Sequence, residues 1–144
     1  MSWPISNGMN ECLFCKIVAG EIPSAKVYED DHFLAFLDIT PIHKGHTLLI
    51  PKEHFRNTLE APDEMLSLLA PVMKKVARAV KNATHADGIN MYINNDKAAG
   101  QVIFHTHIHL IPRFEDDGLH LWRGAELYTD GEMDTVAKKI KREI

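Results

Sequence analysis

The stretch FHTHIHLIPR, residues Phe104–Arg113, carries a histidine at every second position, namely His105, His107 and His109. Successive side chains of a β-strand point to opposite faces of the sheet, so a strand here puts all three imidazoles on one face. Ile108 and Leu110 then point to the other face, where apolar side chains favour burial in a core. Histidine is uncommon and a weak strand former, so a solvent-facing polar row is a poor explanation for three of them in register.

Two kinds of chemistry remain for the three imidazoles. Neutral imidazoles two residues apart on a strand can chelate one metal ion. Alternatively, one imidazole is the nucleophile of a phosphoryl or nucleotidyl transfer, and its neighbours handle protons and charge. Residues 94–101, just before the strand, read NNDKAAGQ and offer amide donors and a glycine. Such groups suit phosphate oxygens, so the composition favours phosphate chemistry over a catalytic metal.

The composition of the whole chain argues against several classes of protein. The chain has 144 residues, which is typical of one domain, and a net charge of −4 without a long basic run, so nucleic acid is not expected as a partner. No stretch approaches the ~20 apolar residues that span a bilayer, so no membrane partner is expected either. Residues 1–10, MSWPISNGMN, lack the features of a secretory signal and are expected to form a disordered arm. Two cysteines imply no disulfide framework, which makes the cytoplasm the expected compartment.

The hydrophobic pattern predicts an α+β order rather than repeated βαβ units. Strands are predicted at Lys26–Glu29, Phe33–Leu37, Gly45–Pro51, Ile89–Asn94 and His105–Pro112. Apolar residues at helical spacing predict a long helix over Asp63–Lys81, which Pro71 should bend, and a last helix over Met133–Arg142.

Five motifs follow one another along the chain: CLFCKIV at residues 12–18, GEIP at 20–23, FLDI at 36–39, KGHTLLIPK at 44–52 and HTHIHLI at 105–111. Together they resemble the histidine triad (HIT) family, and most closely its Hint-like bacterial branch. The resemblance implies a HIT-like fold with an antiparallel sheet of about five strands, one long helix and a C-terminal helix. It also implies a HIT domain over residues 11–113, a tail with a helix over 114–144 in the same domain, and a homodimer.

The resemblance further implies an enzyme that acts on a purine nucleotide. His107 would attack the α-phosphorus of a nucleoside 5′-phosphate derivative and form a covalent nucleotidyl-histidine, from which water releases a nucleoside monophosphate. His109 would contact the phosphate and stabilise charge as the leaving group departs. Asn94 and Gln101 match positions that bind phosphate oxygens or the leaving-group side.

Other positions of the resemblance surround the nucleotide. Asp38 matches the acidic residue that accepts hydrogen bonds from the ribose, and His46 matches a supporting histidine near the triad. Six residues match the apolar pocket around the base, although ordinary core packing explains some of them equally well: Leu13, Phe14, Ile17, Ile22, Phe36 and Ile39. Val102 stands where many Hint-like proteins have serine. Its backbone N–H can still bind phosphate, but without a hydroxyl the turnover of phosphoramidates is expected to be slower.

The Cys12–Cys15 pair has three interpretations: a redox pair, two buried thiols, or half of a structural zinc site. The spacing suits a chelate, and the resemblance supplies His54 and His105 as the other two ligands. The first triad histidine would then bind metal while the second reacts. No magnesium motif occurs, so no obligatory Mg²⁺ is expected.

The leading hypothesis is therefore a nucleotide hydrolase or phosphoramidase that releases AMP or GMP. The alternatives are a dinucleoside polyphosphate hydrolase and a zinc-stabilised nucleotide-binding or scaffold protein with incidental catalysis. The related nucleotidyltransferase branch typically has glutamine where His109 stands, which argues against a sugar-phosphate transferase.

Overall fold

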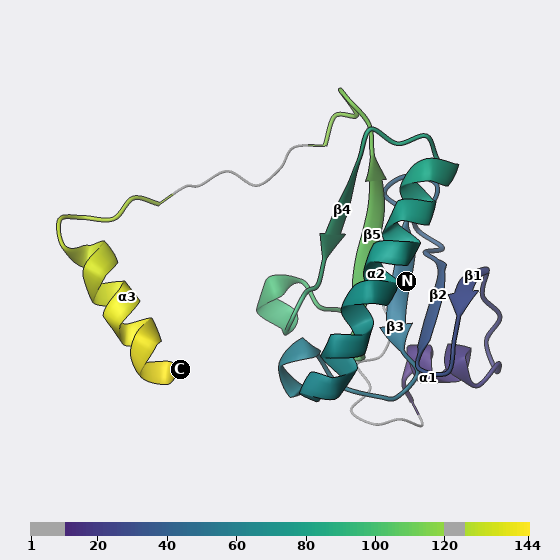
Figure 1. The fold of residues 1–144 in the computed structure, drawn as a ribbon, viewed down its shortest axis with the longest axis horizontal. Coiled ribbons are helices and arrows are strands. Elements are labelled where there is room, and N and C mark those ends of the chain that lie inside the picture. Colours follow the sequence, from purple (N-terminus) through teal and green to yellow (C-terminus); the bar gives the residue numbers. More distant parts are fainter. Residues whose placement is uncertain (1–10, 120–125) are drawn as a thin grey trace.

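Five strands form one antiparallel sheet in the computed structural model, which describes residues 11–119 and 126–144; the expected arm at residues 1–10 lies outside this range. The strands are β1 (Lys26–Glu29), β2 (Phe33–Leu37), β3 (Thr47–Pro51), β4 (Gly88–Tyr92) and β5 (Ile108–Arg113). Their order in the sheet is β1-β2-β3-β5-β4, and every neighbouring pair is antiparallel (Figure 1). This confirms the predicted α+β fold.

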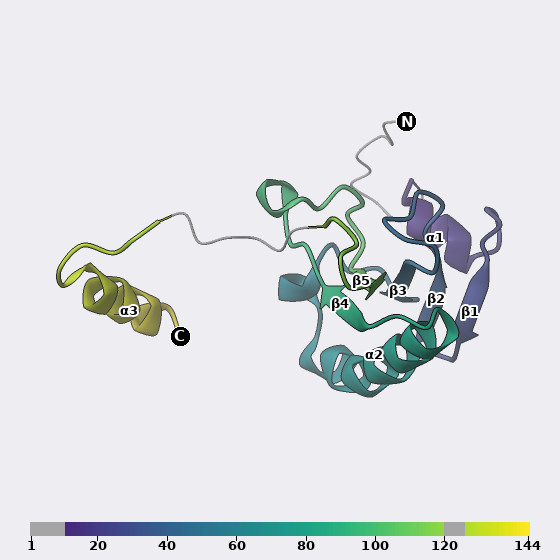
Figure 2. The same ribbon diagram turned by 90° about the horizontal axis from the view of Figure 1, so that it is seen from above.

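The sheet is covered on both faces, by α2 (Asp63–Ala83) on one and by α1 (Leu13–Val18) on the other (Figure 2). The core on the α2 side contains Phe33, Ala35, Leu49, Ile108 and Leu110 from the strands. The alternate side chains, Leu34, Phe36, Leu48 and Ile50, pack with Phe14 and Ile17 of α1. Because both faces are buried, β2 and β3 read as continuous apolar runs. Leu48 is paired with His109 in the ladder, so His109 lies on the α1 face.

The strand that contains the histidines begins later than its sequence predicts. β5 starts at Ile108, so His105 and His107 precede it. The reason is a competing partner, because the N–H of Thr106 donates to the carbonyl of Phe55 at 2.7 Å instead of joining a ladder. Ile108 and Leu110 nevertheless face the core as predicted, with no exposed surface.

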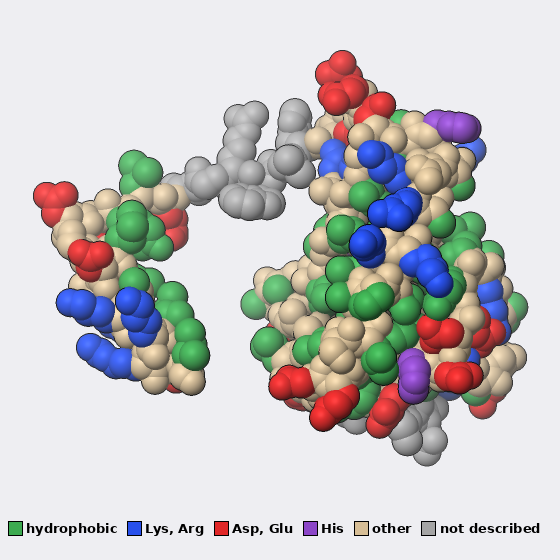
Figure 3. All heavy atoms as spheres, viewed as in Figure 1, with side chains coloured by type: hydrophobic (Ala, Val, Ile, Leu, Met, Phe, Trp, Pro, Cys, Tyr) green, Lys and Arg blue, Asp and Glu red, His purple; other side chains and the backbone are tan. Residues whose placement is uncertain are grey.

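The helices contain one element that the hydrophobic pattern does not predict. α1 has only six residues, too few for a helical period to stand out, and the Cys12 sulfur caps it by accepting from the N–H of Cys15 at 3.4 Å. α2 continues through Pro71 to Ala83. Basic side chains line the C-terminal half of α2 (Figure 3), namely Lys74, Lys75, Arg78 and Lys81. Lys81 lies in the last turn, where its charge complements the helix dipole.

The C-terminal segment contains α3 (Glu132–Glu143), which extends the predicted helix by one residue at each end. None of its residues is buried. Among the helices that the structure describes, none is both long and apolar enough to cross a membrane.

Replacing Leu49 with alanine tests the importance of the core between β3 and α2. Leu49 is fully buried in that cluster, so Leu49→Ala should reduce the free energy of unfolding by about 2–5 kcal/mol, measured by urea denaturation. Leu127→Ala is the matched control, because this leucine is 94% exposed and its loss should stay within about 0.5 kcal/mol. Equal losses in both variants would contradict the assignment of Leu49 to the core.

Candidate active site and metal centre

His107 is buried before β5, and a backbone carbonyl determines which of its nitrogens carries the proton. Its Nδ1 lies 2.7 Å from the carbonyl oxygen of His105. A carbonyl can only accept, so Nδ1–H donates and Nε2 keeps a free lone pair. Burial lowers the pKa of His107, although the bond to the carbonyl opposes this shift, so the ring is neutral at pH 7. The result is a neutral imidazole with a nucleophilic Nε2.

The tautomer of His109 is determined by its hydrogen bond with a second histidine, His46. The backbone N–H of Ile42 donates to Nδ1 of His46 at 3.1 Å, which leaves the proton of a neutral His46 on Nε2. That Nε2 lies 3.0 Å from Nδ1 of His109 and donates to it. His109 therefore carries its own proton on Nε2, where it can donate to a bound anion. Burial, reinforced by the charges of neighbouring histidines, lowers the pKa of His109 to about 4.

Asp38 lies beside this pair, with Oδ2 3.7 Å from Nε2 of His46. Ligand atoms of Asp38, His46 and His109 lie within 4.8 Å of one another, which is close enough for a metal ion. The proton on Nε2 of His46 argues against one there, because the N–H of Ile42 already occupies the other ring nitrogen. The cluster is better described as a hydrogen bond from His46 to His109 with the Asp38 carboxylate close by, and Asp38 itself accepts from the N–H of Thr40.

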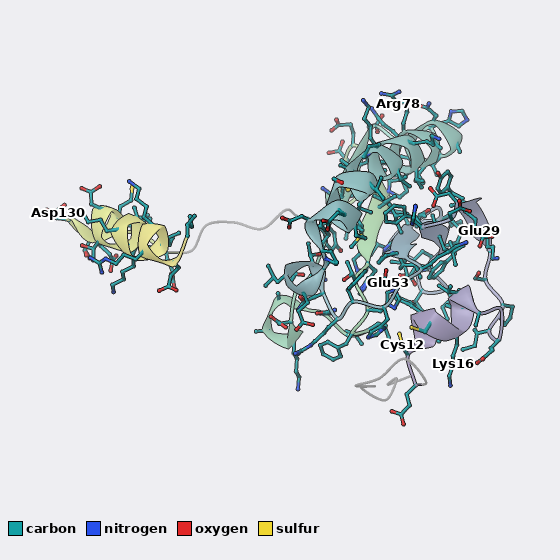
Figure 4. The ribbon with its side chains drawn as sticks, turned by 60° about the horizontal axis from the view of Figure 1, so that its bottom comes forward. Cys12, Lys16, Glu29, Glu53, Arg78 and Asp130 are labelled. Carbon is teal, nitrogen blue, oxygen red and sulfur yellow. The ribbon has the colours of Figure 1, made fainter. Side chains whose placement is uncertain are left out.

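Four residues from different parts of the chain form a second cluster: Cys12, Cys15, His54 and His105. Nδ1 of His105 lies 3.5 Å from the Cys12 sulfur and 3.2 Å from Nδ1 of His54, which in turn is 3.3 Å from the Cys15 sulfur. Ligands about 2.0–2.3 Å from a tetrahedral ion are separated by roughly 3.3–3.8 Å, so these spacings match a Cys₂His₂ site. Figure 4 shows Cys12 at the start of α1, with sulfur atoms beside it.

The protonation of His105 also suits a metal ligand. Its Nε2 donates to the carbonyl oxygen of Pro51 at 2.8 Å, so Nδ1 is unprotonated and faces both thiols. Metal-bound histidines typically donate their other N–H to such an acceptor. The cluster can therefore hold a metal ion. A redox role fits less well, because burial raises the pKa of the Cys15 thiol to about 12 and a protonated thiol is a poor nucleophile.

The apolar residues predicted around the base divide into two groups. Phe14, Ile17 and Phe36 are buried in the core beneath α1, and Leu13 and Ile22 pack half-buried against them. Ile39, in contrast, is 84% exposed. Phe14 also packs edge-on against His107, with 5.2 Å between ring centroids, so this core directly contacts the ring of His107.

The 94–101 loop contains the two predicted amide residues in different settings. Asn94 is half-buried, close to Gly100. Gln101 is buried, and its amide bonds to backbone groups: Nε2 donates to the carbonyls of Arg56 and Ile103, and Oε1 accepts from the N–H of Asp96. The Gln101 side chain therefore holds the 94–101 loop in place, whereas Asn94 presents its amide close to Gly100 of the same loop. The side chain of Val102 is exposed.

Three contributors to the site have no signal in the sequence. Ile42 acts through its backbone N–H, and Tyr92 of β4 stacks on His109 with 5.0 Å between ring centroids. Asn57 is a buried polar residue that bonds to Asp96 of the 94–101 loop. Each contact depends on tertiary structure, and no local motif reveals it.

Known proteins resemble the chain over most of its length. The HIT domain family model matches residues 19–116. Protein hit of Bacillus subtilis is 44% identical and covers 92% of this chain and 94% of its own. An adenylylsulfatase of Arabidopsis thaliana is 41% identical over 94% of this chain and 70% of its own. An adenosine 5′-monophosphoramidase of Candida albicans is 39% identical over 92% of this chain and 91% of its own.

Solved structures agree with these matches. A crystal structure from Streptococcus mutans UA159 has a TM-score of 0.88 at 50% identity and covers 96% of this chain and 88% of that one. A zinc-bound histidine triad family protein of Mycobacterium smegmatis has a TM-score of 0.74 at 38% identity and covers 95% of this chain and 100% of that one. The HIT-like fold and the family resemblance are both confirmed.

The assigned tautomers can be measured by ¹⁵N NMR of the histidine rings at pH 7. We expect the proton on Nδ1 of His107 and on Nε2 of both His46 and His109, with a scalar coupling across the bond between the last two. The coupling should vanish in a His46→Ala variant, while the shifts of His107 stay unchanged. Exposed His32 serves as the control for an averaged signal. A proton on Nε2 of His107 would rule out the proposed nucleophile.

Proposed function

The chain belongs to the HIT family and is a hydrolase of that family, and we propose that it cleaves purine nucleoside 5′-phosphate derivatives at the α-phosphate. The observation that carries this proposal is the free Nε2 lone pair of neutral His107, set beside the Nε2–H of His109. One imidazole is thereby prepared to attack an electrophile and the next to donate to the oxygens around it.

The reaction proceeds in two steps. The Nε2 lone pair of His107 forms a bond to the α-phosphorus, and the bond from phosphorus to the leaving group breaks with its electron pair. Water then attacks the phosphorus of the nucleotidyl-histidine and releases one proton to the solvent. The N–P bond breaks with its electron pair returning to Nε2 of His107, and a nucleoside monophosphate leaves. His109 donates its N–H to a phosphate oxygen and stabilises the developing charge in both steps.

The kinds of leaving group that the enzyme can expel depend on whether the site can supply a proton to them. An amine needs one as it departs, whereas sulfate or a phosphate leaves as a stable anion. Val102 offers no hydroxyl for that purpose. Two relatives are named for adenylyl compounds, an adenylylsulfatase and an adenosine monophosphoramidase. We therefore expect AMP anhydrides to be cleaved faster than AMP amides, with dinucleoside polyphosphates as the alternative anhydride substrate.

The remaining site residues would hold the nucleotide. Asp38 has Oδ2 available to accept from ribose hydroxyls, since its Oδ1 accepts from Thr40. Exposed Ile39 follows it and can cover the base. Asn94 and the backbone N–H of Val102 would bind phosphate oxygens, and Gln101 would contribute by shaping the loop that carries them.

We also propose that the Cys₂His₂ cluster holds a structural Zn²⁺ and that the protein is a homodimer. A zinc-bound relative of the same fold supports the choice of metal. Zinc here would stabilise α1 against the sheet, because its ligands come from the start of α1, from the segment after β3 and from the residue before Thr106. β4 lies at the edge of the sheet with Met91 and Tyr92 exposed, which supports pairing between two copies.

Replacing His107 with alanine tests the covalent mechanism. AMP release from adenylyl sulfate, an adenosine phosphoramidate and diadenosine polyphosphates should fall by about three orders of magnitude or more, because the nucleophile is lost. AMP binding, measured by calorimetry, should persist, because the pocket remains. A His32→Ala variant changes an exposed histidine and should keep full activity. Normal turnover by the His107→Ala variant would contradict the mechanism, and binding without turnover by the wild type would favour a nucleotide-binding role.

The metal can be tested by elemental analysis of the purified protein. We expect about one zinc ion per chain and its loss in Cys15→Ser, because a hydroxyl is a far weaker zinc ligand than a thiolate. Loss of zinc should lower the melting temperature, since it joins α1 to the sheet. A Ser67→Ala variant on the surface of α2 should keep its zinc. Zinc far below one per chain in the wild type, or full zinc in Cys15→Ser, would refute the site.

A further inference from the structure

Residues 54–58, which we call the strap, connect the segment that precedes β5 to the 94–101 loop. The carbonyl of Phe55 accepts from the N–H of Thr106 at 2.7 Å and from its hydroxyl at 3.1 Å. The carbonyl of Arg56, the next residue, accepts from the amide of Gln101 at 2.7 Å. Neighbouring residues of the strap thus bind the residue before His107 and the end of the loop.

Asn57 makes the third connection through its side chain. This residue is only 3% exposed, and its Nδ2 donates to Oδ1 of Asp96 at 3.0 Å. Its own Oδ1 accepts from the N–H of Leu59 at 3.1 Å and caps the short helix η1 (Thr58–Glu60). The N–H of Thr58 adds a bond to the side chain of Asn95 at 2.9 Å. Both ends of the buried amide are therefore used, one for the strap and one for the loop.

Asp96 needs such a restraint because its backbone is strained. It has φ of +71° and ψ of 161°, a region that is essentially restricted to glycine. Gln101 closes the loop around it, accepting from the N–H of Asp96 at 2.8 Å and donating its own N–H to the carbonyl of Asp96 at 3.1 Å. Two residues of the strap reach the Asp96 side chain: buried Asn57 donates to its Oδ1 at 3.0 Å, and the exposed guanidinium of Arg56 lies 3.5 Å from the same oxygen. A strained residue persists only where the surrounding contacts over-determine it.

We propose that Asn57 is a positioning residue that holds the 94–101 loop, and with it Asn94, in register with His107 for binding the substrate phosphate. This inference rests on the proposed function, in which that loop contacts phosphate. Asn57 itself touches no substrate. It acts through Asp96, and the strap fixes the distance between the loop and the nucleophile because it binds both.

An Asn57→Asp variant separates positioning from general stability. The carboxylate keeps the oxygen that caps η1 but replaces the donor with an acceptor that repels Asp96. Calorimetry on the full zinc-loaded chain should show AMP binding weakened about tenfold, which corresponds to about 1.4 kcal/mol. Adenosine, which has no phosphate, should bind with an unchanged Kd. Asn82→Asp, the same change on the exposed surface of α2, should alter neither ligand.

A second pair of variants keeps the test decisive if Asn57→Asp folds poorly. Asp96 is exposed, so its replacement should not unfold the chain. Asp96→Ala should weaken AMP binding selectively, because alanine has neither the acceptor nor the backbone freedom. Asp96→Gly should lose less, because glycine adopts this backbone without strain, and it should partly restore AMP binding in the Asn57→Asp background.

The binding measurements distinguish a failure of the positioning role of Asn57 from a failure of the proposed phosphate site. Equal weakening of AMP and adenosine, or no weakening of either, overturns the role of Asn57 while leaving the phosphate site intact. Wild-type protein that binds AMP no more tightly than adenosine overturns the phosphate site and the role of Asn57 together. Selective loss of AMP binding with partial recovery in the double variant supports both.

Discussion

A buried neutral imidazole has one N–H and one lone pair, and most of this site follows from the need to satisfy both. The carbonyl of Pro51 accepts from the Nε2–H of His105, which leaves Nδ1 of that ring with the lone pair. The carbonyl of His105 accepts from the Nδ1–H of His107, which leaves Nε2 of that ring with the lone pair. Opposite ring nitrogens thus carry the lone pair in His105 and His107, two histidines of one motif that are separated only by Thr106. Their chemistry is decided by which backbone group each one meets.

The fold buries these imidazoles, and burial is the reason why each N–H needs a hydrogen-bond acceptor within the protein. α1 covers the face of the sheet on which His109 lies, and its Phe14 packs against His107. The same short helix brings Cys12 and Cys15 to His105, so the candidate metal cluster and His107 both lie against α1, where Phe14 contacts His105 and His107. Covering the opposite face with α2 buries Ile108 and anchors β5. The candidate site therefore depends on two helices that contact different faces of one sheet.

Patterns of local origin can be read from the amino-acid sequence alone. The apolar run of β2 and the helical period of α2 depend on which side chains face a core, and both elements begin where predicted. The start of β5 cannot be read in this way, because Thr106 bonds to Phe55, a residue distant in sequence. α1 is not predicted either, because its six residues are too few to show a helical repeat of apolar positions. The resemblance to a family supplied His54 as a ligand, which spacing alone could not.

The alternating histidines, the paired cysteines and the apolar runs of the strands are visible in the order of residues, and they indicate an α+β fold and a preference for phosphate chemistry. The tertiary structure alone decided which nitrogen of each histidine carries the proton, because those partners are backbone groups. It alone also decided that Asn57 bonds to the strained Asp96. Backbone carbonyls and N–H groups are the same at every position of a chain, so their role appears only when folding brings them to a particular side chain.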